Sequence, residues 1–138
     1  MDKWVCQLLD SEPRGFLASS YRNSPHVVPV VFVRLHDRIY SPIDAKPKAT
    51  HRLRRVRNIE HNNAVSFMLD NYDADWQKLW WLRLDGLASI GPLSNAIAEL
   101  LVCKYPQYRS MDVGSTAIEL SEIRWRYWSM DGSRPLAN

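Results

Sequence analysis

The feature of this sequence that most constrains its fold is an alternation of apolar and polar side chains over residues 79–90, LWWLRLDGLASI. Neighbouring side chains of a β-strand point to opposite faces, so one set of residues packs inward while the other faces outward. The inward set is Trp80, Leu82, Leu84, Ala88 and Ile90, and the outward set is Trp81, Arg83, Asp85 and Ser89. This pattern requires a sheet with one buried face.

Other segments favour the same kind of sheet. Residues 26–34 (HVVPVVFVR) are rich in β-branched side chains, and the preceding RNSP has turn chemistry. Further strands are expected at 15–20, 38–41, 64–69 and 116–120, and helices near 4–9, at 53–59 and from Gly91-Pro92 to Lys104. The sequence therefore predicts a mainly β (α+β) fold, a six-stranded antiparallel barrel with flanking helices at its rim.

The length and composition bound the domain organisation. A chain of 138 residues that is 46% apolar is expected to form one domain over residues 1–130, followed by a tail over 131–138. Its longest nearly apolar run, 27–33, is far shorter than the ~20 residues that span a bilayer. The N-terminal residues lack the apolar core of a signal peptide, so we expect a cytoplasmic protein without a membrane partner. Cys6 and Cys103 are then expected to be free thiols.

The densest positive charge lies in residues 44–57, DAKPKATHRLRRVR. Leu53, Val56 and Ile59 have the spacing of the buried side of a helix, which leaves the arginines on the surface. One interpretation is a solvated helix face. The other is an anion site, because Lys46 and Lys48 precede a helix N-terminus whose free N–H groups favour phosphate. The sequence leaves both open.

Motifs for other chemistries are absent. No nucleotide-binding loop, paired-cysteine motif or serine-hydrolase motif occurs, and no catalytic residue is identified. The four histidines lack metal-ligand spacing, and the acidic residues 70–75 lack the glycine of a calcium loop, so no metal site is expected. A net charge of +3 without a nucleic-acid motif argues against a nucleic-acid partner.

Three tryptophans, Trp81, Trp125 and Trp128, allow two interpretations. They either fill the core or form a wall against a flat heteroaromatic ring or a dimer partner. A cofactor that combines a flat ring with a phosphate would account for the aromatic side chains and the basic segment together. It would also explain the missing catalytic constellation, because the hydride chemistry then belongs to the cofactor.

Four segments, read in order, resemble the pyridoxamine 5'-phosphate oxidase-like split-barrel proteins, and more narrowly their subgroup of F420-dependent enzymes. They are PHVVPVVFV (25–33), RIYSPIDAKPK (38–48), LRRVRNI (53–59) and LWWLRLDGLASI (79–90), within a similarity that covers residues 14–128. The resemblance implies a six-stranded split β-barrel and a homodimer with two cofactor sites at the subunit interface. It also implies FMN or the deazaflavin F420 as the ligand.

The resemblance assigns roles to particular residues. Val30 and Val31 would place strand backbone against the ring, and Tyr40 and Ser41 would line the site from the next strand. F420 fits somewhat better than FMN, because its oligoglutamate tail could follow the Arg52–Arg57 surface. The remaining implied site residues are Lys46 or Lys48 at the phosphate, and Trp81 and Arg83 from the neighbouring subunit. From the basic segment itself, Arg54 and Arg55 are expected to extend the anion site.

Two departures from the family pattern limit the prediction. The vitamin B6 oxidases proper have a C-terminal Arg-x-His, whereas this chain has Arg124-Trp125-Arg126, so vitamin B6 oxidation is not expected. Asn62-Asn63 replaces an Asn-Pro of many relatives, which changes only a turn. The leading prediction is an FMN- or F420-dependent oxidoreductase that exchanges hydride with a small organic substrate. The alternative is a non-catalytic split-barrel protein that binds flavin or haem.

Overall fold

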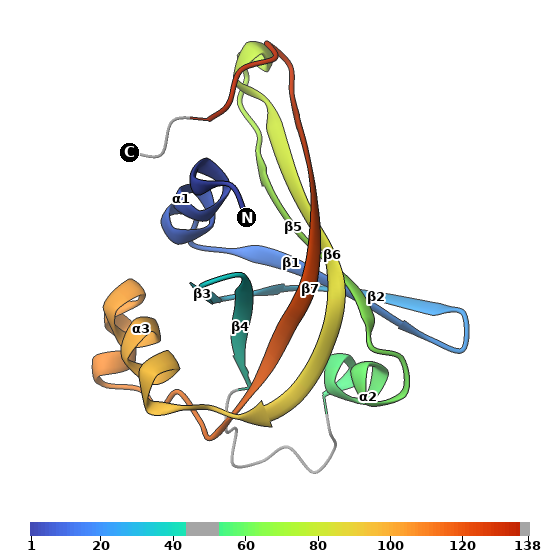
Figure 1. Ribbon diagram of the computed structural model, residues 1–138, viewed down its shortest axis with the longest axis vertical. Coiled ribbons are helices and arrows are strands. Elements are labelled where there is room, and N and C mark those ends of the chain that lie inside the picture. The colour runs from blue at the N-terminus through green and yellow to red at the C-terminus, as the bar shows by residue number, and fades with distance from the viewer. Residues whose placement is uncertain (44–52, 136–138) are drawn as a thin grey trace.

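The computed structural model describes residues 1–43 and 53–135 of the chain (Figure 1). Within these ranges there are three α-helices, α1 (Lys3–Ser11), α2 (Arg54–His61) and α3 (Asn95–Lys104), and two short 3-10 helices, η1 (Trp76–Lys78) and η2 (Pro106–Arg109). The strands are β1 (Gly15–Tyr21), β2 (Ser24–Val30), β3 (Val33–Leu35), β4 (Arg38–Ile43), β5 (Ala64–Asn71), β6 (Trp80–Pro92) and β7 (Thr116–Ser129). None of the described helices is long and apolar enough to cross a membrane.

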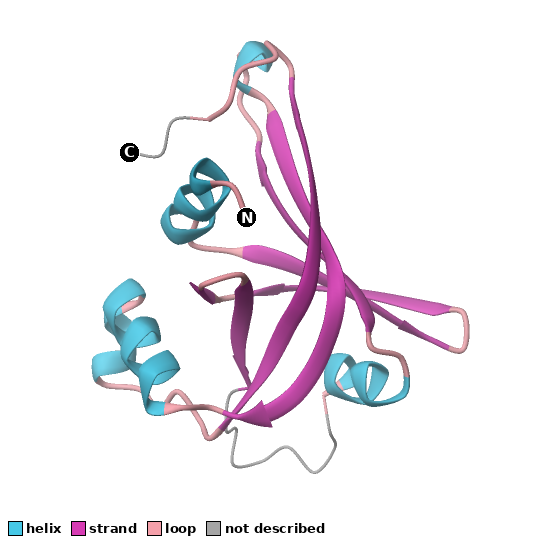
Figure 2. Ribbon diagram, viewed as in Figure 1, coloured by secondary structure: helices cyan, strands magenta, loops and turns pink. Residues whose placement is uncertain are grey.

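All the strands belong to one antiparallel sheet, in the order β2-β1-β5-β6-β7-β4-β3. β2 and β3 lie at its two ends, so strand pairing among the described residues leaves the sheet open. β5, β6 and β7 form its long, strongly twisted part, and the β1–β2 hairpin crosses them (Figure 2). The described residues confirm a mainly β fold with flanking helices.

The strand count differs from the expected six because the segment predicted as one strand over 26–34 is two. β2 ends at Val30, and β3 begins at Val33. Between these two strands, the backbone forms hydrogen bonds with side chains instead of with a neighbouring strand. The Val31 carbonyl accepts from the Ser41 hydroxyl (2.8 Å), and the Phe32 N–H donates to the Tyr105 hydroxyl (3.0 Å). These side chains satisfy the polar backbone groups where the ladder stops. The chain then joins the opposite end of the sheet as β3.

The predicted two-faced strand at 79–90 is confirmed within β6. Leu82, Leu84 and Ala88 are buried, and Trp80 packs on the same core, while Trp81 lies on the opposite face. A register shift lies between Asp85 and Leu87, where β6 approaches β7 closely. A Cβ on Gly86 would lie 2.5 Å from the Ser121 carbonyl oxygen, so glycine is required there. The extra residue lies in β7, whose core-facing positions pass from Ile118 and Leu120 to Ile123, Trp125 and Tyr127, while the alternation of β6 continues unbroken.

The helices lie at different sides of the sheet. α1 and α3 lie on the left of the long strands in Figure 1, and α2 lies on the right, beside the β1–β2 hairpin. α1 covers the core through Val5, Leu8 and Leu9, which are almost completely buried. Ser94 caps α3 by accepting from the Ile97 N–H (3.3 Å), so this helix begins later than the predicted start at Gly91-Pro92, which belongs to β6.

Candidate functional site

The sheet face that points away from the core, termed the outer face, brings side chains from four strands into rows. One row of paired positions, from β1 across β5 and β6 to β7, consists of Phe16, Met68, Arg83 and Arg126. The next row is Ala18, Ser66, Asp85 and Arg124, and a further pair is Trp81 with Trp128. Side chains at paired positions of adjacent strands project to the same face. The outer face is therefore a mixed surface of aromatic, apolar and charged groups.

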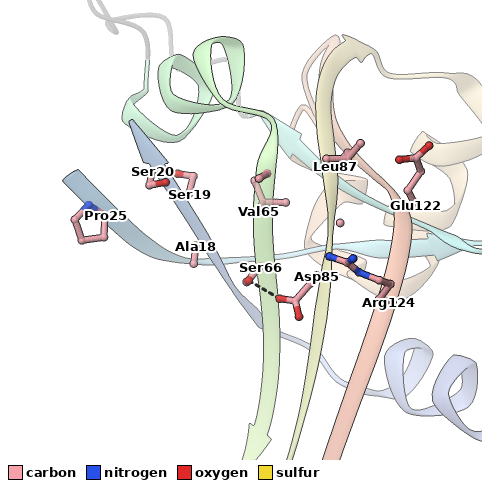
Figure 3. A pocket seen from close by; sticks show the side chains of 12 residues that line it. Ala18, Ser19, Ser20, Pro25, Val65, Ser66, Asp85, Leu87, Glu122 and Arg124 are labelled. Carbon is pink, nitrogen blue, oxygen red and sulfur yellow. Dashed lines mark hydrogen bonds between the residues drawn. The ribbon is translucent and has the colours of Figure 1, made fainter. Parts of the chain in front are cut away.

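An open cavity of about 770 Å³ lies on this face. Figure 3 shows Ser66 and Asp85 pointing toward each other from β5 and β6, with Arg124 extending toward them from β7. The Ser66 hydroxyl donates to Asp85 Oδ1 (2.5 Å), and Arg83 Nε donates to Asp85 Oδ2 (3.0 Å). The lining residues are Ala18, Ser19, Ser20, Pro25, Ala64, Val65, Ser66, Asp85, Gly86, Leu87, Glu122 and Arg124.

Asp85 is the electrostatic centre of this cavity. Burial alone would raise the pKa of its carboxyl, but the hydrogen bonds from Ser66 and Arg83 and the charges of Arg83 and Arg124 hold it below the usual value. The carboxylate is therefore ionised at neutral pH, and it holds Arg83 in a defined orientation. Sequence reasoning placed Asp85 on the polar face but assigned it no role, because its pairing with Ser66 depends on the register of β5 against β6.

The four residues predicted to line a ring lie around the break between β2 and β3. Val30 is buried in the core, and the next residue, Val31, offers its carbonyl to the buried hydroxyl of Ser41. Tyr40 is half-buried and packs instead on the small cluster of Val33, Ile97 and Leu101. Val31 and Ser41 are thus brought together, while Tyr40 points toward α3.

The predicted anion-binding residues are only partly within the described chain, because Lys46 and Lys48 lie outside it. Arg54 and Arg55 begin α2. Arg54 donates to the Ser24 hydroxyl on β2. Burial lowers the pKa of His26 on the same strand, and the charges of Arg54 and Arg55 lower it further. Both arginines therefore act on the electrostatics of this end of β2.

A separate cavity of about 310 Å³, termed the arginine pocket, lies between α2 and the β1–β2 turn. The Tyr21 and His61 rings stack at one side, with centroids 4.4 Å apart, and the Arg22 guanidinium lies 5.0 Å from the Tyr21 ring centroid. Within the described part of the chain, no acidic residue lines the pocket. Its lining residues are Tyr21, Arg22, Ser24, Arg54, Arg57, Asn58 and His61.

The last two predicted site residues, Trp81 and Arg83, lie on the outer face. The Arg83 guanidinium lies 5.9 Å from the Trp81 ring centroid, within reach of a cation–π contact. In the sheet order, β1 and β5 separate these residues from β2, and β7 separates them from β4. Of the other tryptophans, Trp125 packs on the core beside Trp4, and Trp128 is 41% exposed on the outer face. Among residues 1–43 and 53–135, no group of three or more His, Cys, Asp or Glu side chains is arranged to hold a metal ion.

Comparison with known proteins identifies the fold. No protein-family model matches the chain, and no curated protein matches it in sequence. Among solved structures, the conserved hypothetical protein Rv2991 of Mycobacterium tuberculosis is 19% identical with a TM-score of 0.73, over 94% of this chain and 85% of that one. A candidate pyridoxamine 5'-phosphate oxidase of Listeria innocua is 17% identical with a TM-score of 0.64, over 93% and 96% of the two chains.

A third solved structure carries a cofactor in its name. The FAD binding protein of Mycobacterium smegmatis is 17% identical with a TM-score of 0.59, over 94% of this chain and 98% of that one. All three likenesses extend over nearly the whole chain, and at these identities they establish the fold. The chain therefore has the fold of the pyridoxamine 5'-phosphate oxidase-like proteins, as the resemblance of its four segments predicted.

Proposed function

We propose that this chain is a homodimeric split-barrel oxidoreductase that binds F420 or FMN at the subunit interface and exchanges hydride with a small organic substrate. The observation that carries the proposal is the arginine pocket, a cationic cavity lined by no acidic residue of 1–43 or 53–135, on a fold shared with a FAD binding protein. The guanidinium groups gathered there repel one another, and an anionic group of a ligand would relieve that repulsion.

The residues present fit a cofactor with several negative charges. The pocket gathers Arg22, Arg54 and Arg57, and Arg54 is already oriented by its bond to Ser24. Guanidinium groups bind carboxylates through paired hydrogen bonds, which suits the oligoglutamate tail of F420. A single FMN phosphate would use fewer of these groups, with Lys46 or Lys48 as the predicted contact. We therefore favour F420.

The outer face supports a homodimer. Exposed apolar side chains lie on or beside it: Val27 is 63% exposed, Trp128 41%, and Met68 and Leu87 each 36%. Exposed large apolar side chains on one face are typical of protein interfaces. A second copy of the chain would cover it and would receive Trp81 and Arg83 as contributions to its cofactor site.

A bound flavin or deazaflavin would supply the hydride chemistry. The protein's own residues would bind and orient. The Ser41 hydroxyl holds the Val31 carbonyl, and so fixes the backbone at the end of β2. Asp85 holds one edge of the Arg83 guanidinium, which leaves the other N–H groups of Arg83 available to an anion.

Cofactor titration tests the proposal. The purified protein is titrated separately with F420 and FMN while the visible spectrum and tryptophan fluorescence are followed, and its mass is measured by light scattering. We expect a dimer that binds F420 at micromolar concentration or tighter, and Lys48→Ala with weakened binding but an unchanged circular dichroism spectrum. A chain that binds neither cofactor refutes the proposal. Tight binding without any reduction or oxidation of the cofactor across a substrate panel would instead indicate a non-catalytic binding protein.

A further inference from the structure

A second site lies on the other side of the sheet from the outer face, between α1, β3 and α3. An open cavity of about 500 Å³ lies there, within the ~300–1,000 Å³ typical of small-molecule sites. In Figure 1 both helices lie on the same side of the molecule, with β3 between them. We term it the lysine cavity. Its lining residues are Asp10, Val33, Arg34, Leu35, His36, Leu100, Cys103 and Lys104.

Lys104 is held in poorly hydrated surroundings. Its ammonium lies 3.7 Å from the centroid of the fully buried Phe32 ring, and it donates to the Leu9 carbonyl near the end of α1 (3.0 Å). Burial lowers the pKa of Lys104 to about 8. An ammonium has three N–H donors, and the bond to the Leu9 carbonyl uses one of them.

Three charged residues line the cavity, and they differ in how directly they are paired. Arg34 is neutralised by Asp10, which accepts two hydrogen bonds from its guanidinium (2.9 and 2.7 Å). Lys104 forms no ion pair with a carboxylate of the described residues, although Asp10 and Glu12 both act on it from α1 at longer range. The lining itself therefore carries one net positive charge, and Glu12 is a further carboxylate beyond the lining that acts on Lys104 at longer range.

We propose that the lysine cavity binds a small monocarboxylate with an apolar body. The carboxylate pairs with the Lys104 ammonium, and the apolar body packs against Val33, Leu35 and Leu100. A single negative charge neutralises the lining, whereas an amine would add a further positive charge. A neutral alcohol of the same length would fill the cavity and leave the ammonium unpaired. The site shares no residue with the arginine pocket or with the outer face.

This pairing links binding to the protonation of Lys104. A bound carboxylate stabilises the charged amine and raises its pKa. Below the pKa of the free protein the lysine is already charged, so affinity is independent of pH there. Above it each binding event takes up a proton, and affinity falls by up to about tenfold per pH unit. The other titratable or charged groups that face Lys104 or line the cavity are Asp10, Glu12, Arg34, His36, Cys103 and Tyr105.

Matched probes test the proposal in the full chain. Octanoate, 1-octanol and octylamine share one apolar body and differ in charge, and isothermal titration calorimetry measures their binding at pH 7. We expect octanoate to bind about tenfold or more tightly than 1-octanol, and octylamine not to bind. The octanoate titration is repeated up to pH 9.5 with Cys103→Ser, which removes the thiol from the lining. Equal affinity for octanoate and 1-octanol, or no octanoate binding at millimolar concentration, overturns the proposal.

Variants locate the site. Lys104→Met keeps an apolar stem and removes the charge, and it should lose about tenfold or more in octanoate affinity together with the pH dependence. Lys78→Met, on the exposed helix η1, is the control and should bind as the unaltered protein does. Leu100→Trp fills the cavity while keeping the lysine and should also abolish binding, which keeps the test decisive if Lys104→Met does not fold. Unchanged binding in Leu100→Trp places the ligand elsewhere and refutes the assignment.

Discussion

The arginine pocket and the lysine cavity both hold positive charge, but they hold it in different surroundings. The arginine pocket lies beside an exposed turn, and its Arg54 is oriented by the hydroxyl of Ser24. In the lysine cavity, the Lys104 ammonium lies against the Phe32 ring and donates to the Leu9 carbonyl. A guanidinium stays charged at every physiological pH, whereas a buried amine does not. The first region is suited to hold a permanent polyanion, and the second to sense a single charge.

The sharpest way to break this comparison is to remove two arginines at once. Arg54→Ala combined with Arg57→Ala should weaken F420 binding by about 100-fold, because two charge-assisted hydrogen bonds are lost at about tenfold each. FMN, with one phosphate, should lose less. Fluorescence titration measures both affinities, and Arg109→Ala, an exposed arginine of η2, is the matched control. An equal loss of affinity for F420 and FMN would show that the arginine pocket does not bind the oligoglutamate tail of F420.

The next largest effect concerns the backbone of Phe32, whose ring Lys104 contacts. Tyr105→Phe removes the hydroxyl that bonds the backbone of Phe32, and it should lower the free energy of unfolding by about 1–3 kcal/mol. Urea denaturation followed by tryptophan fluorescence measures the change. Tyr72→Phe is the control, since Tyr72 is 75% exposed. If the two variants are equally stable, the hydroxyl is not what holds the break between β2 and β3.

The smallest expected effect is a pH dependence of the unfolding free energy that arises from the Lys104 amine and not from the arginines. The pKa of Lys104, about 8 when folded, lies below its unfolded value of ~10.4, so the unfolded chain binds more protons between these values. Lys104 therefore makes stability rise as pH increases from about 8, by an amount that partial exposure keeps small.

Subtraction isolates this contribution. The unfolding free energy of Lys104→Met is subtracted from that of the unaltered protein at each pH from 7 to 9.5. Other titrating groups are common to both proteins, including the N-terminal amine, whose pKa is raised by its bond to Asp37. The difference should grow in favour of the unaltered protein as the pH rises. The same subtraction with Arg57→Ala should give a flat line, and a slope there would contradict the comparison.

Parts of both regions were predictable and parts were not. The sequence analysis identified the arginines of α2 as surface cations, because Val56 and Ile59 have the spacing of a buried helix face and are in fact buried. It did not foresee that Tyr21 and Arg22 complete a pocket with them, since these residues come from a turn more than thirty positions earlier. It placed Lys104 only near the end of a helix, with no sign of the Phe32 ring or the Leu9 carbonyl beside it.

The sequence by itself determined the two-faced strand at 79–90, the basic surface of α2 and the resemblance that the fold confirmed. These follow from local periodicity, which each segment carries without reference to the rest of the chain. The tertiary structure alone decided the break after Val30, the Ser66–Asp85 bond and the surroundings of Lys104. Those contacts join residues as much as 95 positions apart, and they exist only because strand register and helix packing bring the partners together.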